Sequence, residues 1–145
     1  SNGDTVCSLP FFKEGLQHVK FENGDLKSSE TQGEVIANDK IRLIHDALVL
    51  GIRDYFEKQG FKKAMLGLSG GIDSALCAAM AVDALGASRV RCVMLPYRFT
   101  SQESLTDAAS IAKALGVQYD IVPIEPAVGG IEAAADALQA LVTPA

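Results

Sequence analysis

The most constraining feature of this sequence is an apolar, strand-like run that passes through two adjacent glycines directly into a helix. Residues 64–68 read Ala-Met-Leu-Gly-Leu, residues 69–74 read Ser-Gly-Gly-Ile-Asp-Ser, and residues 75–81 form an alanine-rich segment typical of a helix. Gly70 and Gly71 allow backbone conformations closed to residues with a Cβ atom, so successive N–H groups can converge on one anion at the positive end of the helix. The sequence therefore predicts a phosphate-binding turn between a strand and a helix.

The side chains of this turn also suit nucleotide phosphates. Ser69 and Ser74 supply hydroxyl donors for phosphate oxygens, and Asp73 supplies a hard carboxylate that can hold Mg²⁺ against them. No Gly-Lys-Ser/Thr sequence follows the glycines, which excludes a Walker A loop. The alternative is that Ser69 or Asp73 only caps the helix, with the glycines making a tight turn. A cap requires one such residue, whereas this turn has two serines, two glycines and an aspartate.

Strand-like and helical segments alternate along the rest of the chain. Strands are expected at residues 64–68, 90–95 and 119–124, and helices at 39–58, 73–85, 102–115 and 131–141. Gly86 and Gly116 are expected to end the second and third helices, and Asn38 or Asp39 to cap the first. This alternation predicts an α/β fold, a three-layer parallel sheet with helices on both faces. Ligands of such sheets bind at the carboxyl ends of the strands, where the glycine turn lies.

The N-terminal part of the sequence has a different pattern. Residues 5–9 and 16–21 alternate apolar and polar side chains as strands do, and residues 27–33 are polar and linker-like. Two short strands bury little surface alone, so we expect them to belong to another sheet. Residues 1–30 are interpreted as a hairpin at the end of a preceding domain, 31–38 as a linker, and 39–145 as the first part of the nucleotide-binding domain. In the helix at 39–58, one face is expected to pack on the sheet through its apolar side chains, Ile41, Ile44, Leu48, Ile52 and Phe56.

Composition restricts the class of protein. The chain has 145 residues, 48% of them hydrophobic, and a net charge of −5, as expected of a globular protein without a basic surface for nucleic acid. No run approaches the roughly 20 apolar residues of a membrane span, and the N-terminus does not resemble a signal peptide. Cys7, Cys77 and Cys92 are widely spaced, and the last two lie in segments expected to be buried. We expect free thiols and a cytoplasmic location.

Residues 69–74 match the SGGxDS signature of the N-type ATP pyrophosphatases. These enzymes cleave ATP between the α and β phosphates, adenylate an acceptor oxygen, and let a nitrogen or sulfur nucleophile displace AMP. Within this superfamily, residues 46–55, 60–62, 81–86 and 94–101 resemble the start of the synthetase domain of the glutamine-dependent NAD synthetases, with similarity from about residue 41 to 141. Residues 1–21 resemble the closing strands of the nitrilase-like glutaminase domain that precedes it in this family.

The resemblance implies an adenine nucleotide alpha hydrolase-like, Rossmann-like fold and ATP-dependent amidation of deamido-NAD to NAD through an acyl-adenylate, with ammonia from glutamine. It implies ATP and Mg²⁺ as cofactors, Asp73 as a metal ligand, and a homo-oligomer without nucleic-acid or membrane partners. No catalytic residue is assigned, because the glutaminase triad would lie upstream, and the deamido-NAD-binding elements and a further acidic metal ligand downstream. We therefore expect this polypeptide alone to be inactive. The ATP-binding residues implied are Gly67, Leu68, Ser69, Gly70, Gly71, Ile72, Asp73, Ser74, Leu95 and Arg98.

Several alternatives remain open from the sequence. Gly67 can serve function or only close packing, Arg98 can bind phosphate or lie on the surface, and Thr100 or Ser101 with Ser104 suits a helix cap. The acceptor can be that of another ATP pyrophosphatase, such as GMP synthetase. A non-catalytic nucleotide-binding module has the same signature turn.

Overall fold

The computed structural model describes residues 5–28 and 39–142. Contacts divide the chain into two compact units, Ser1–Gly51 and Ile52–Ala145, and each unit is described by itself. The predicted linker at 31–38 lies outside the described residues. None of the described helices is long and apolar enough to cross a bilayer.

The first unit contains an antiparallel hairpin of β1 (Val19–Glu22) and β2 (Asp25–Ser28). Asn23 and Gly24, with φ of 54° and 88°, form the two-residue turn between them. An Asn-Gly pair with positive φ at both residues gives a turn whose twist matches the right-handed twist of the two paired strands. The prediction of a strand at residues 16–21 is confirmed only from Val19 onward. The predicted strand at 5–9 is wrong, because this segment has no regular secondary structure, and β2 occupies the start of the predicted linker-like stretch.

The helix α1 (Lys40–Gln59) begins where the sequence predicts. The Asp39 carboxylate accepts hydrogen bonds from the amides of Ile41 and Arg42, at 3.1 and 3.3 Å, which makes Asp39 the N-cap. The predicted buried face is only partly confirmed. The apolar residues of the first half, Ile41, Ile44 and Leu48, are more than half exposed, whereas Ile52 and Phe56 are half-buried.

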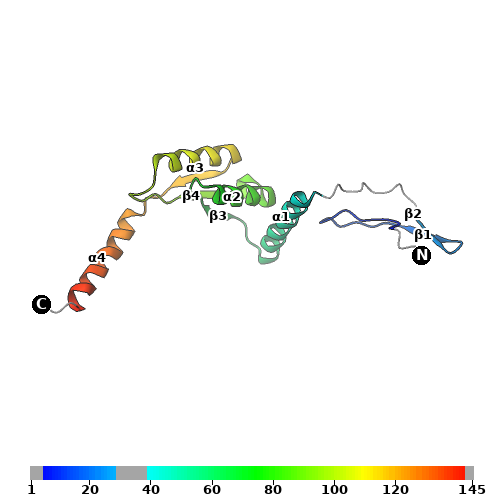
Figure 1. Cartoon of the computed structure of the whole chain (residues 1–145), viewed down its shortest axis with the longest axis horizontal. Helices are drawn as coiled ribbons and strands as arrows, with labels where there is room; N and C mark the ends of the chain where they lie inside the picture. The colour runs from blue at the N-terminus through cyan, green and yellow to red at the C-terminus, as the bar shows by residue number, and fades with distance from the viewer. Residues whose placement is uncertain (1–4, 29–38, 143–145) are drawn as a thin grey trace. The chain divides into compact units, whose positions relative to one another are not determined.

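The second unit is built on a parallel sheet with the order β3-β4-β5. Its strands are β3 (Ala64–Gly67), β4 (Val90–Met94) and β5 (Gln118–Ile121). Its helices are α2 (Ile72–Leu85), the short 3₁₀ helix η1 (Ala87–Arg89), α3 (Gln102–Leu115) and α4 (Glu125–Val142). Figure 1 shows α2 and α3 beside the strands that they connect. The predicted α/β class, a Rossmann-like parallel sheet with helices, preceded by a short hairpin, is confirmed.

The core lies between one face of this sheet and the helices α2 and α3. The register pairs Leu66 with Cys92 and Cys92 with Tyr119, so these three side chains point to the same face. Both helices contact β4 and each other, and they bury alanines: Ala78, Ala81 and Ala84 on α2, and Ala108 and Ala112 on α3. Such small side chains let a helix backbone approach the sheet closely. Tight packing of this kind fixes where each helix begins relative to the strand ends.

The observed bounds of an element agree best with the predicted ones where a serine or a glycine caps a helix end. The helix α3 has the predicted bounds and ends at Gly116 in the left-handed conformation. The strand β5 ends three residues early, although the amides of Val122 and Ile124 still bond to the carbonyls of Met94 and Pro96. The helix α4 begins six residues earlier than predicted, with a proline in its first turn, where the missing N–H is not needed.

The three cysteines occupy different environments. Cys92 is fully buried in β4, as predicted, and burial raises the pKa of its thiol. Cys77 is exposed on α2, so the expectation that it is buried is wrong: it lies one turn before Ala81, near the start of the helix, where the described residues leave its side chain uncovered. Cys7 is half-buried outside any strand. All three are free thiols, as predicted.

Candidate functional site

The signature turn connects the end of β3 to the start of α2. Gly70 has a φ of +85°, in the left-handed region that favours glycine. Gly71 has φ −80° and ψ 158°, an extended conformation open to other residues, and it is the N-cap of α2. The prediction that both glycines need special backbone freedom is therefore wrong for Gly71, because a single left-handed residue is enough to turn the chain into the helix.

Two serine hydroxyls hold the turn in shape. The Ser74 hydroxyl donates to the carbonyl of Gly71 at 2.9 Å and accepts from the amide of Ser69 at 3.2 Å. The two serine hydroxyls lie 3.0 Å apart, and the Ser69 hydroxyl also accepts from the Gly71 amide at 3.3 Å. No side chain caps α2, which argues against the alternative that Ser69 or Asp73 serves only as a helix cap. These bonds cross the turn and fix its backbone.

Gly70, Ile72 and Asp73 are among the residues of the turn whose amides remain available. None of the three donates a hydrogen bond to a described residue. They lie at the N-terminus of a 14-residue helix, where N–H groups and the helix dipole favour an anion. This geometry suits the phosphates of a nucleotide.

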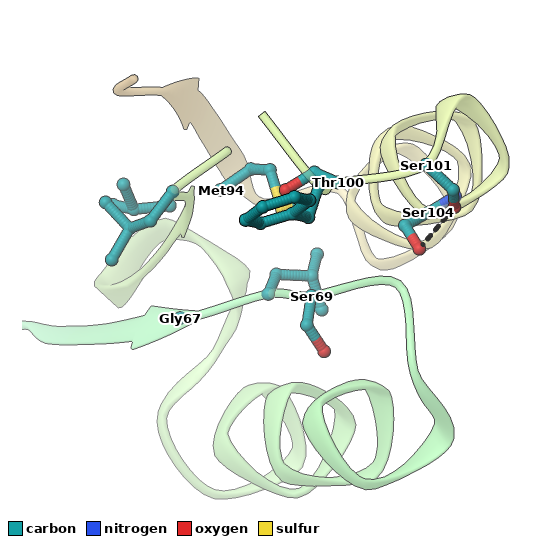
Figure 2. Close-up of a pocket in the computed structure, with 10 residues that line it drawn as sticks. Gly67, Ser69, Met94, Thr100, Ser101 and Ser104 are labelled. Carbon is teal, nitrogen blue, oxygen red and sulfur yellow. Dashed lines mark hydrogen bonds between the residues drawn. The ribbon is translucent and has the colours of Figure 1, made fainter. Parts of the chain in front are cut away.

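A cavity of about 500 Å³ opens next to this turn, at the carboxyl ends of β3 and β4. Apolar side chains and backbone make up much of its lining, and serine and threonine side chains make up the rest. Figure 2 shows Met94 and Thr100 across the cavity from Ser69, whose hydroxyl points toward α2, and Ser101 and Ser104 at the start of α3. The lining residues are Gly67, Leu68, Ser69, Val93, Met94, Leu95, Phe99, Thr100, Ser101 and Ser104. A volume of this size accommodates a nucleoside.

The start of α3 forms the hydroxyl-bearing side of the cavity. Ser101 is its N-cap and accepts a hydrogen bond from the Ser104 amide at 3.1 Å, which confirms the predicted capping role. Ser101, Ser104 and Thr100 also line the cavity, which the sequence analysis did not predict. Their position directly after the second parallel strand was the signal that could have identified them.

Leu95 and Arg98, both predicted to bind ATP, have different surroundings. Leu95 lines the cavity. Arg98 does not, and its guanidinium instead donates to Glu132 of α4 at 3.0 Å and lies over the rings of Tyr97 and Phe99. Gly67 lines the cavity, and a Cβ built on it meets no atom within 4 Å, so close packing does not account for glycine there.

Asp73 lies exposed in the first turn of α2, beside the free amides. Its carboxylate and the hydroxyls of Ser69 and Ser74 are hard oxygen donors, the type that Mg²⁺ prefers. In the described ranges, no group of three or more histidine, cysteine, aspartate or glutamate side chains could hold a metal ion together. Asp73 is therefore suited to hold an ion that is also bound by phosphate oxygens, rather than to form a protein-only metal site.

Comparison with known proteins places this geometry in a family. The family model of NAD synthase matches residues 44–143. The glutamine-dependent NAD(+) synthetase of Rhodobacter capsulatus is 46% identical over 134 residues, which cover 92% of this chain and 24% of that protein. The chain thus spans about a quarter of the length of that relative.

Solved structures agree with this assignment. The glutamine-dependent NAD+ synthetase from Acinetobacter baumannii, in complex with adenosine diphosphate, matches with a TM-score of 0.87 and 40% identity over 99% of this chain and 27% of that one. An NMN synthetase from Francisella tularensis matches with a TM-score of 0.62 and 26% identity over 66% of this chain and 40% of that one. The family model spans more than half of the sequence, and the chain belongs to the NAD synthase family.

Proposed function

We propose that this chain forms the ATP-binding part of a glutamine-dependent NAD synthetase. The observation that carries the proposal is the position of the hydroxyl-braced turn beside the cavity at the carboxyl ends of β3 and β4. The phosphates would lie on the amides of Gly70, Ile72 and Asp73, and the nucleoside in the cavity. The ADP named in the complex of the Acinetobacter baumannii relative supports an adenine nucleotide as the ligand.

The proposed reaction activates a carboxylate. A carboxylate oxygen of deamido-NAD attacks the α phosphorus of ATP and pyrophosphate leaves, which forms an acyl-adenylate; ammonia then attacks the carbonyl carbon and AMP leaves. The charge that builds on the departing pyrophosphate is stabilised by N–H dipoles already oriented by the turn. Asp73 would hold a Mg²⁺ ion bound to the phosphates, and such an ion would supply further positive charge there.

We also propose that residues 1–30 end a glutaminase domain and that residues 39–145 begin the synthetase domain of a longer protein. The asparagine-glycine hairpin and the match of the family model from residue 44 support this division. The ammonia would then come from glutamine hydrolysed in the preceding domain. Oligomerisation and a cytoplasmic location remain proposals that accompany this assignment.

The experiment supplies the longer protein with ATP, Mg²⁺ and glutamine and measures pyrophosphate release with different acceptors. Deamido-NAD should stimulate release strongly, while xanthosine monophosphate should leave it at background. Nicotinic acid mononucleotide is a third acceptor, because an NMN synthetase shares this part of the fold. If one of the other two acceptors stimulates pyrophosphate release and deamido-NAD does not, the proposed activity is wrong and the protein is a synthetase for that other acceptor.

A non-catalytic module is tested in the same assay. Such a protein would bind ATP without releasing pyrophosphate under any acceptor. Adenine nucleotide binding by equilibrium titration, together with the complete absence of turnover, would establish that alternative.

A further inference from the structure

The turn between β4 and α3 presents an aromatic side chain at the cavity. Phe99 is 82% exposed, yet it is one of the residues that line the cavity. Because the ring borders the apolar part of the cavity lining, its exposed area is placed where a bound ligand can cover it. This position raises the question of what lies against the ring.

The backbone around Phe99 is held by two hydrogen bonds. The amide of Tyr97 donates to the Thr100 hydroxyl at 3.0 Å, and the amide of Thr100 donates to the carbonyl of Tyr97 at 2.8 Å. Both bonds close the same four-residue turn, and Phe99 lies within it. Its backbone is therefore fixed before any ligand binds.

The Phe99 ring is also supported from the protein side. The guanidinium of Arg98 lies over it, 5.3 Å from the centroid, and the Tyr97 ring meets it edge to face at 5.6 Å. One oxygen of Glu132, on α4, accepts from Arg98 at 3.0 Å and from the Tyr97 hydroxyl at 3.3 Å. A residue more than thirty positions away thus fixes both supports of the ring.

We propose that Phe99 is the surface on which the base of the bound nucleotide stacks, and that Glu132 is a positioning residue that acts through Arg98 and Tyr97. This inference rests on the proposed nucleotide site. A nucleobase is flat and apolar on its faces, so it matches an aromatic ring beside the apolar side chains that line the cavity. The hydroxyls of Thr100 and Ser101 then lie where a ribose can bond to them, and the phosphates extend to the turn at Gly70.

The test separates base binding from phosphate binding. Isothermal titration measures the dissociation constants of ADP and of inorganic tripolyphosphate, each with Mg²⁺, for the full chain and its variants. Phe99→Ala should weaken ADP about 10-fold, in the range found for loss of one base–aromatic stack, and leave tripolyphosphate within about twofold. Phe99→Tyr should retain ADP affinity. Phe21→Ala removes another exposed phenylalanine, on β1, and serves as the matched control.

The role of Glu132 is tested by Glu132→Gln, with Asp136→Asn one helical turn later on α4 as the control. Glu132→Gln should weaken ADP about threefold without affecting tripolyphosphate. Combined with Phe99→Ala it should weaken ADP no further than Phe99→Ala alone, because a positioning residue acts only through the ring. Independent, additive losses would overturn this part of the proposal.

Two outcomes distinguish this inference from the proposed function. If the unmodified chain binds ADP and Phe99→Ala leaves its affinity unchanged, or weakens tripolyphosphate equally, the stacking role is wrong and the nucleotide site stands. If the unmodified chain binds neither ADP nor tripolyphosphate, the nucleotide site fails, and the stacking role fails with it.

Discussion

A Cβ atom on Gly70 would lie 2.5 Å from the backbone carbonyl oxygen of Ser104. The signature turn and the first turn of α3 are therefore in contact through their backbones, with no side chain between them. Because backbone atoms cannot move aside as the end of a flexible side chain does, this contact couples the phosphate turn to the side of the cavity formed by α3. Glycine is required at position 70 by this contact as well as by its positive φ.

Gly70→Ala should therefore disturb the site far more than Gly71→Ala. The alanine at position 70 adds the strain of a left-handed conformation, about 1–2 kcal/mol, to the overlap with Ser104. At position 71 the backbone is extended and the nearest atom to a Cβ, the Ser69 hydroxyl, is 3.5 Å away, so stability should change by less than about 0.5 kcal/mol. Chemical denaturation of both variants measures this difference, and equal destabilisation would contradict it.

The difference between the two glycines shows where sequence reasoning reached its limit. A strand, a glycine turn and a helix are local features, and the sequence predicts them with nearly correct bounds. The serine cap and Gly116 likewise place both ends of α3. Gly70, the glycine with positive φ, also approaches the Ser104 backbone, which belongs to the next crossover of the sheet. That tertiary contact is not visible in the local pattern.

Other misses have a similar cause. Gly129 and Gly130 lie inside α4, although glycine disfavours helix by about 1 kcal/mol, so propensity alone places the start of this helix too late. The pairing of Arg98 with Glu132 joins residues 34 positions apart, and no sequence pattern at either position indicates it. Phe99 was overlooked as a cavity residue for the same reason.

Ser74→Ala should loosen the turn and weaken nucleotide binding. It removes the acceptor of the Ser69 amide and the donor to the Gly71 carbonyl, bonds that contribute about 1 kcal/mol net. The dissociation constant of ADP should rise about fivefold. Ser110→Ala is the control, since that hydroxyl bonds only to the carbonyl of Thr106 within α3. An unchanged ADP affinity in Ser74→Ala would show that its hydroxyl does not organise the turn.

Asp73→Asn should abolish the gain in ADP affinity that Mg²⁺ provides. The amide side chain is a weaker ligand for a hard cation, while the helix loses only about 0.3–1 kcal/mol of interaction between the carboxylate and its dipole. Glu103 lies in the first turn of α3 and is not one of the residues that line the cavity, so Glu103→Gln removes a comparable helix charge outside the site. Titration with and without Mg²⁺ distinguishes the two variants. A Mg²⁺ effect that survives Asp73→Asn would assign the ion to other ligands.

The thiols should differ sharply in reactivity. Cys77 is exposed, whereas Cys92 is fully buried and its thiol pKa is raised by that burial, so at pH 7.5 it is both shielded and protonated. Iodoacetamide should modify Cys77 at least about 100-fold faster than Cys92, because Cys92 reacts only when the fold opens. Peptide mapping by mass spectrometry over time measures both rates. Comparable modification rates for the two thiols in the native chain would mean that Cys92 is accessible at the surface.

The ion pair between β4 and β5 should make stability depend on pH in the acid range. Arg91 donates a hydrogen bond to Asp120 at 2.6 Å, and this bond, with the positive charge beside it, lowers the pKa of the Asp120 carboxyl below its usual value. A carboxyl whose folded pKa is depressed contributes stability above its unfolded pKa, near 4, and loses it as the pH falls through the lower folded value.

Thermal unfolding at pH 7, 5 and 3 tests this relationship with Asp120→Asn. The unmodified chain should have the higher melting temperature at pH 7 and 5, and the difference should shrink at pH 3, because the unfolded carboxyl is then largely protonated and the stability is lost as the pH falls toward the lower folded value. Arg91→Met should reproduce this pattern, because without the guanidinium neither the hydrogen bond nor the charge lowers the Asp120 pKa. A difference between the unmodified chain and Asp120→Asn that is the same at all three pH values would mean that the pair contributes only packing between the two strands.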